Sequence, residues 1–171
     1  MANDAIEIVV EIPKGSRNKY EYDDAGGYFK LDRVLYSSVH YPTDYGFFPD
    51  TLAEDGDHLD ALVIITEPTF TGCHIQVRPI GMLSMSDEKG VDAKILCVPV
   101  RDPRFDEFKD LGSVPSHLLV EIENFFATYK VLEGKPTATL GWSDAEEAWK
   151  VIDDSHARCR EKHGGPGPCG H

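Results

Sequence analysis

The sequence lacks any apolar run that approaches the roughly 20 residues needed to cross a bilayer. Its first residues, Met1 to Asp4, have no basic segment followed by an apolar one, so we expect no export signal and a cytoplasmic location. Cysteines are few and scattered, with no Cys-x-x-Cys pair; they are Cys73, Cys97, Cys159 and Cys169. This spacing disfavours a zinc site and a disulfide framework, and it suits free thiols in a reducing compartment.

Positive charge is also scarce. The sequence has 17 Lys and Arg residues against 30 Asp and Glu residues, which gives a formal net charge of −13. This balance opposes binding to nucleic acids and to anionic membranes. An anionic substrate would therefore have to meet a local group of basic side chains or bound metal ions.

The length of 171 residues is that of one domain, and such a chain buries about 70% of its unfolded surface. We expect residues 1–163 to form a single domain. Residues 164–171 lack bulky apolar side chains, so we expect a disordered C-terminal tail there.

Hydrophobic periodicity predicts strands in the first part of the chain and helices in the last part. Alternating or continuous apolar patterns predict strands at 6–12, 19–22, 28–31, 62–65, 74–83 and 93–100, of which the second and third form a hairpin. Residues 84–92 read as a polar loop. Apolar residues at three- and four-residue spacing predict a helix over 118–129, and Ser143 with Glu146 indicates a capping box for a second helix. The order predicts an α+β domain, with short strands in a small barrel and helices packed outside.

Three carboxylates lie within six residues and lead directly into an apolar strand: Asp55, Asp57 and Asp60. Clustered carboxylates raise one another's pKa unless a cation neutralises them, so the group indicates ligation of a hard metal ion. The alternative is an acidic, solvated loop. A calcium loop of the EF-hand type is disfavoured, because Gly56 stands second and Leu59 fifth in the motif.

A second acidic group, Asp87, Glu88 and Asp92, falls near the polar loop. If the barrel brings it beside the first group, the aspartates supply ligands for two or more divalent ions; otherwise these are two independent solvated loops. Lys19 and Glu21 are two apart on a predicted strand and share a face. Fixed positive charge of the kind that phosphoryl oxygens need comes from Lys19, Arg33, Lys94 and Lys130.

A set of motifs in a fixed order carries a resemblance to a known family. They are Glu11-Ile12-Pro13, Lys19-Tyr20-Glu21, Asp32-Arg33, Tyr41-Pro42-Thr43-Asp44-Tyr45-Gly46, Asp55-Gly56-Asp57-His58-Leu59-Asp60, Arg78-Pro79-Ile80-Gly81, Asp87-Glu88 with Asp92-Ala93-Lys94, and Phe125-Phe126 with Tyr129-Lys130. Together they span nearly the whole chain, which resembles the soluble family I inorganic pyrophosphatases of the bacterial type.

The resemblance implies a five-stranded OB-like β-barrel flanked by two C-terminal helices, a homohexamer, and hydrolysis of pyrophosphate to two orthophosphates by in-line attack of a metal-activated hydroxide. It implies several Mg²⁺ ions in each active site. Implied metal ligands are Asp55, Asp60, Asp87, Asp92 and Glu21, and implied phosphate-binding residues are Lys19, Arg33, Lys94, Tyr129 and Lys130. Asp57 matches the general base, Tyr45 orders the metal ligands, and Glu11 and Tyr41 line the cavity.

Two other classes of function remain open at this point. A small barrel can bind oligonucleotides, but such a module needs a basic groove with exposed aromatic side chains, whereas this chain is acidic. A non-catalytic buffer of divalent cations would bind metal without releasing phosphate, and it would have no use for the dispersed cations from Lys19 to Lys130.

Overall fold

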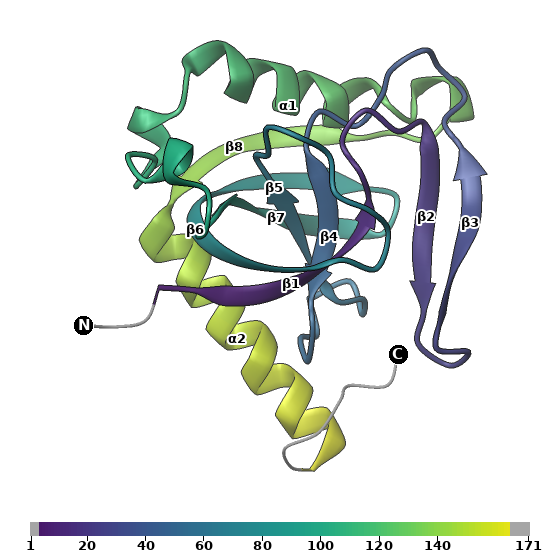
Figure 1. Cartoon of the computed structure of the whole chain (residues 1–171). Helices are drawn as coiled ribbons and strands as arrows, with labels where there is room; N and C mark the ends of the chain where they lie inside the picture. The colour runs from purple at the N-terminus through teal and green to yellow at the C-terminus, as the bar shows by residue number, and fades with distance from the viewer. Residues whose placement is uncertain (1–3, 165–171) are drawn as a thin grey trace.

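The computed structural model describes residues 4–164, in which five strands close into a ring. A six-stranded sheet has the order β1-β4-β5-β7-β6-β8, and an additional pairing of β6 with β1 closes the first five of these strands into the ring seen in Figure 1. The strands are β1 (Ile6–Ile12), β4 (Asp44–Phe48), β5 (Leu59–Val63), β6 (His74–Asp87), β7 (Gly90–Pro99) and β8 (Ala138–Asp144). The predicted five-stranded barrel is confirmed, and β8 extends it along β6.

The β2–β3 hairpin forms a second, separate sheet. Strands β2 (Asn18–Asp23) and β3 (Tyr28–Val34) pair only with each other, and Figure 1 shows them standing beside the ring. Their bounds extend the predicted hairpin by a few residues at its open end. The hairpin is therefore held against the ring by side chains and by a few backbone contacts, not by strand pairing.

Two helices cover the ring, as the periodicity predicts. Helix α1 (Ser116–Thr128) buries Ile122, Phe125 and Phe126, and helix α2 (Ala145–His163) buries Ala148 and Ile152. Three short 3-10 turns are η1 (Pro103–Phe105), η2 (Leu111–Ser113) and η3 (Val131–Glu133). No helix within residues 4–164 combines the length and the apolar content that a bilayer crossing requires.

The ring strands divide their side chains between two apolar clusters. Along β7, Leu96 and Val98 belong to the cluster that contains the buried residues of α1. Ile95 and Cys97 belong to the cluster that contains Ala148 and Ile152 of α2. The alternation follows from the two-residue period of a strand, and it explains why residues 95–98 of this strand are all apolar.

Two local expectations are wrong. Residues 84–92 are not a loop: β6 continues to Asp87, and β7 begins at Gly90 after a tight turn in which the Asp87 carboxylate accepts a hydrogen bond from the Lys89 backbone N–H at 2.8 Å. Ser143 does not cap α2, because it lies in β8. The cap is Asp144, whose side chain accepts a hydrogen bond from the backbone N–H of Glu147.

Two further outcomes concern the cysteines and the tail. Cys73 and Cys97 have free thiols as expected, whereas Cys159 is disulfide-bonded, so that expectation is wrong for Cys159; spacing along a chain does not report which thiols meet. Gly164 ends α2 in the left-handed conformation, with φ of 70°. The remainder of the predicted disordered tail lies outside the described residues.

Candidate active site

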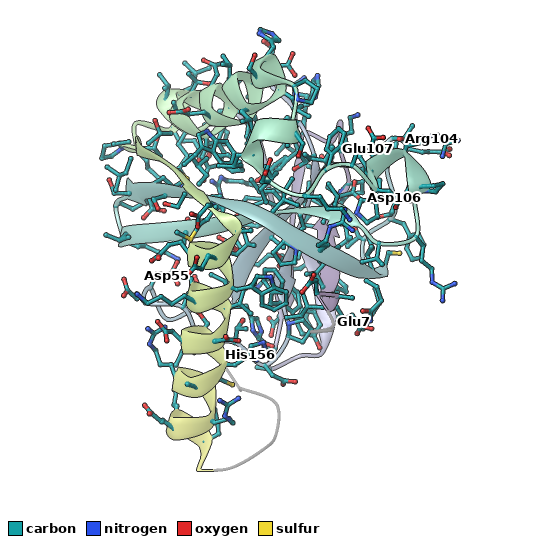
Figure 2. All side chains as sticks on the ribbon, turned by 90° about the vertical axis from the view of Figure 1, so that its left-hand side faces the viewer. Glu7, Asp55, Arg104, Asp106, Glu107 and His156 are labelled. Carbon is teal, nitrogen blue, oxygen red and sulfur yellow. The ribbon has the colours of Figure 1, made fainter. Side chains whose placement is uncertain are left out.

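An open cavity of about 320 Å³ lies where the hairpin faces the ring, and it collects charged side chains of both signs. It brings together nearly every site residue expected from the sequence: Glu11, Lys19, Glu21, Arg33, Tyr45, Asp55, Asp57, Asp60, Asp87, Asp92, Lys94, Tyr129 and Lys130. The two acidic groups therefore converge on one cavity. Acidity alone does not mark this site, since Asp106 and Glu107 lie on the other side of the molecule from Asp55 in Figure 2.

Strand pairing explains why distant residues meet. Parallel pairing of β5 with β7 places Asp60 opposite Lys94, and antiparallel pairing of β2 with β3 places Lys19 opposite Arg33. Residues directly opposite on neighbouring strands have Cβ atoms about 5 Å apart. Sheet register thus pairs a cation with a carboxylate on the ring and two cations on the hairpin.

Lys94 is the most enclosed cation of the site, with only 2% of its side chain exposed. Its ammonium donates to Asp60 at 2.9 Å and to the Tyr45 hydroxyl at 3.0 Å, and it forms an ion pair with Asp92 at 3.0 Å. It also lies 5.0 Å from the ring centres of Tyr45 and Phe126. Lys94 therefore neutralises two carboxylates that would otherwise repel each other.

Lys130 is a second enclosed cation of the cavity. The Lys130 ammonium is 3.4 Å from Asp87 and 3.3 Å from Glu88, and its side chain is 9% exposed. Burial lowers the pKa of Lys130, but neighbouring Tyr129, Asp87 and Glu88 outweigh burial and raise it above the usual value. Lys130 therefore carries a positive charge at neutral pH.

The hairpin contributes its cations through one shared carboxylate. Asp32 lies 3.5 Å from the Lys19 ammonium, and it also accepts a hydrogen bond from Arg33. The Arg33 guanidinium forms a second ion pair, at 2.7 Å, with Glu133 at the end of η3. Two carboxylates thus orient Arg33 while it lines the cavity.

Burial perturbs several of the carboxyl groups. It raises the pKa of Glu11 to about 8, because desolvation outweighs the hydrogen bond from the Tyr22 backbone N–H. Burial also raises the pKa of Asp92 to about 6 despite the nearby Lys94 ammonium, and it raises the pKa of Asp55. Perturbed carboxyl groups in a cavity are typical of functional sites and of sites that await a cation.

Asp57 differs from its acidic neighbours because it is open to solvent. Its side chain is 60% exposed, and its Oδ2 lies 3.5 Å from the ammonium of Lys89. Asp55 and Asp60 lie on either side of it in sequence and are more enclosed. A carboxylate with this exposure can exchange protons with water more readily than its neighbours.

Tyr41, which the resemblance implied as a cavity residue, does not line the cavity. It is 1% exposed and belongs to the apolar core, where its ring packs 4.7 Å from that of Phe125 and 5.4 Å from that of Tyr45. A large aromatic side chain after a turn gains most by burying its area. Tyr41 thus packs against Tyr45 from the side of the apolar core.

The cavity also includes residues that were not expected to form part of a site: Tyr22, Asp24, Asp32, Phe47, His58, Glu88, Lys89 and Lys135. Some lie directly beside expected residues in sequence, so proximity was the available signal. Asp24 and Phe47 carried no such signal, because only the packing of the hairpin on β4 brings them to the cavity.

The side chains present fit a hard divalent cation. The acidic side chains offer carboxylate oxygens, which are the ligands that Mg²⁺ prefers, and no cysteine within residues 4–164 lines the cavity. In residues 4–164 no three His, Cys, Asp or Glu side chains are grouped closely enough to hold an ion as they stand. Lys94 lies between Asp60 and Asp92, so the carboxylates have an internal counter-ion in this arrangement.

Comparisons with known proteins agree with one another. A family model described as inorganic pyrophosphatase matches residues 8–160. The inorganic pyrophosphatase of Methanosarcina mazei is 56% identical over 155 residues, which cover 91% of this chain and 92% of that protein. That of Geobacillus stearothermophilus is 52% identical over 160 residues, covering 94% and 97%. The crystal structure of inorganic pyrophosphatase from Thermus thermophilus superposes with a TM-score of 0.90 at 47% identity, covering 93% of each chain.

Proposed function

The chain belongs to the inorganic pyrophosphatase family, and from this premise we propose that it hydrolyses pyrophosphate to two orthophosphates. The observation that supports the proposal most directly is the convergence of four cations and six carboxylates on one cavity: Lys19, Arg33, Lys94 and Lys130, with Glu21, Asp55, Asp57, Asp60, Asp87 and Asp92. A cation buffer would need only the carboxylates, and an oligonucleotide-binding groove would need only the cations and aromatic rings.

Several Mg²⁺ ions are the proposed cofactor. Asp55, Asp60, Asp87, Asp92 and Glu21 would hold them, and Tyr45 would orient Asp60 through its shared contact with Lys94. When bound, such ions lower the pKa of a coordinated water and offset the charge of phosphoryl oxygens.

The cationic side chains bind and orient the substrate. Lys19 and Arg33 on the hairpin and Lys130 after α1 lie on different walls of the cavity, so they can hold both phosphoryl groups at once. The Tyr129 hydroxyl group adds a neutral donor, since burial raises its pKa. Phosphoryl transfer depends mainly on positioning and on neutralising charge at the leaving group, which is the contribution of these residues.

Asp57 is the proposed general base. It lies between two proposed metal ligands in sequence but is much more exposed, so it can accept the proton of the attacking water and pass it to solvent.

The Asp57→Asn variant tests the assignment. We expect Mg²⁺-dependent phosphate release from pyrophosphate to fall by about 10² to 10⁴-fold, the usual contribution of a general base, while the fold is retained. Phosphate release and circular dichroism measure the two effects. Asp106→Asn, an exposed carboxylate beside η1, is the matched control and keeps wild-type turnover. Robust turnover in Asp57→Asn would remove Asp57 from this role.

We also propose that residues 1–163 form one domain and that the protein is a cytoplasmic homohexamer. Exposed apolar residues of β3 support assembly, because Tyr28, Leu31 and Val34 are 54%, 52% and 46% exposed. Apolar groups gathered on a surface are typical of interfaces. Sedimentation equilibrium should give six times the mass of one chain; a monomer at micromolar concentration would contradict the proposal.

A further inference from the structure

The hairpin that carries part of the site has no strand pairing with the ring. Within residues 4–164, strands β2 and β3 form sheet pairings only with each other, yet Lys19, Glu21 and Arg33 of this hairpin all line the cavity. The distance between these side chains and the carboxylates of the ring therefore depends on the contacts that attach the hairpin. Those contacts include the hydrogen bond from the Tyr22 backbone N–H to the Glu11 carboxylate at 2.8 Å and the ion pair of Arg33 with Glu133 at 2.7 Å; a further one lies at the closed end of the hairpin.

Asp24, in the hairpin turn, contacts His58, in the acidic connection before β5. The His58 Nε2 atom lies 3.0 and 3.1 Å from the two carboxylate oxygens of Asp24. A carboxylate only accepts hydrogen bonds, so Nε2 carries the hydrogen and donates it. Both side chains are largely enclosed, at 14% exposed for His58 and 20% for Asp24. Enclosure limits competition from water and strengthens such a bond.

Aromatic stacking fixes the orientation of the histidine. The His58 ring stacks on Phe47 of β4, with ring centres 4.6 Å apart and an angle of 19° between the planes. Phe47 in turn stacks on Tyr22 of β2, with ring centres 5.7 Å apart and an angle of 18°. A chain of contacts thus runs from His58 in the acidic connection, through Phe47 of β4, to Tyr22 of the hairpin.

We propose that Asp24 and His58 are positioning residues, which hold the hairpin against the acidic connection and so set the width of the pyrophosphate site. This inference rests on the proposed function. The Asp24–His58 hydrogen bond keeps Lys19 and Arg33 at the distance at which they reach a substrate held by the carboxylates of the ring. Neither residue touches the reacting atoms.

A second histidine–carboxylate pair shows why location matters. His74 lies 2.8 Å from Glu7, but these side chains are 59% and 47% exposed. The pair joins β6 to β1, which already bond to each other through their backbones. It therefore adds little to the position of either strand, and His74→Ala is a matched control.

The test is a set of four variants: Asp24→Ala, His58→Ala, the double variant, and His74→Ala. The hairpin cations contact the substrate before and during reaction, so loosening them weakens ground-state binding. We expect the KM for magnesium pyrophosphate to rise about tenfold in each single variant, with kcat within threefold of wild type. The KM of the double variant should equal that of the single variants, because the same contact is lost in all three. His74→Ala should retain the wild-type KM.

His58→Gln provides the rescue, since its side-chain amide can donate to Asp24 from nearly the same place. We expect this variant to recover most of the wild-type KM. A KM within twofold of wild type in either single alanine variant overturns the inference. The inference is also overturned if the KM increases of the two single variants multiply in the double variant, or if His74→Ala raises the KM as much as they do.

Binding separates failure of this inference from failure of the proposed function. Isothermal titration calorimetry of each variant with methylenediphosphonate in the presence of Mg²⁺ measures affinity without turnover. We expect Kd to rise about tenfold in Asp24→Ala and His58→Ala only. If the wild type binds the diphosphonate but releases no phosphate from pyrophosphate, the proposed function fails while this inference is still tested. An unchanged Kd in both variants overturns the inference.

Discussion

At the scale of single residues, Lys94 determines the electrostatics of the site. Burial lowers its pKa, but Asp60 and Asp92 outweigh burial and raise it well above the ordinary value. The ammonium therefore stays charged at neutral pH. A buried carboxylate without its partner would cost several kcal/mol, so Lys94 stabilises the metal-free arrangement of the ring carboxylates.

Burial of Glu11 makes the free energy of unfolding depend on pH. The pKa of Glu11 is about 8 in the folded protein against an ordinary value of 4.5, because burial disfavours the charged form. The stabilisation from the retained proton is complete below pH 4.5 and is lost as the pH rises through about 8. In metal-free protein we expect Glu11→Gln to be more stable than wild type by about 2 to 4 kcal/mol at pH 9.

Urea unfolding in EDTA at pH 4 and pH 9 measures this difference. The two proteins should have nearly equal stability at pH 4, where wild-type Glu11 is protonated in both states. Glu7→Gln, at an exposed position on the same strand, is the matched control and should show no such difference. Equal stability of wild type and Glu11→Gln at pH 9 would contradict the burial argument.

Much of the cavity lining could be predicted at this scale, because motif residues carry their chemistry in their own side chains. Tyr41 could not be assigned correctly, since an aromatic residue after a turn is suited both to a cavity and to a core. Asp24 and His58 were missed for another reason. Their contact joins the hairpin turn to the acidic connection, 34 residues further along the chain, and no local pattern reports such a meeting.

At the scale of elements, β4 and β8 escaped prediction. Strand β4 lies between prolines and contains Gly46, which usually mark turns. Gly46 is required there because a Cβ atom would lie 2.0 Å from the carbonyl oxygen of Val9 on β1. Strand β8 lies at the edge of the sheet and has no fully buried residue, so it lacks a strong apolar alternation. Close approach and edge position are tertiary properties.

The N-cap predicted for helix α2 differs from the observed one. The Asp144 carboxylate accepts a hydrogen bond from the Glu147 backbone N–H at 3.0 Å, whereas Ser143 lies in β8. We expect Asp144→Ala to lower the free energy of unfolding by about 1 kcal/mol, the usual value of an N-cap. Ser143→Ala is the control and should change it by less than about 0.5 kcal/mol. Thermal or urea unfolding measures both, and the reverse order of effects would restore the Ser143 cap.

At the scale of the whole molecule, the net charge of −13 is concentrated in part around one cavity. A ligand that binds only the folded protein stabilises it by mass action, by about 2.7 kcal/mol at 100 times its Kd. We therefore expect Mg²⁺ to raise the unfolding temperature of EDTA-treated protein. NaCl at equal ionic strength is the control for screening. If NaCl raises the temperature as much as MgCl₂ does, no specific cation site exists.

Closure of the ring has a consequence for synthesis on the ribosome. Strand β1 pairs with β4 on one side and with β6 on the other, where Val9 lies opposite His74. Strand β1, which is translated before both of its partners, thus keeps one side unpaired until the segment around His74 has left the exit tunnel. Non-local pairing of this kind is slow and exposes apolar strand to aggregation. A pause in translation before that segment would prolong the vulnerable interval, whereas a pause after Pro99, when β7 is complete, would allow the ring to close.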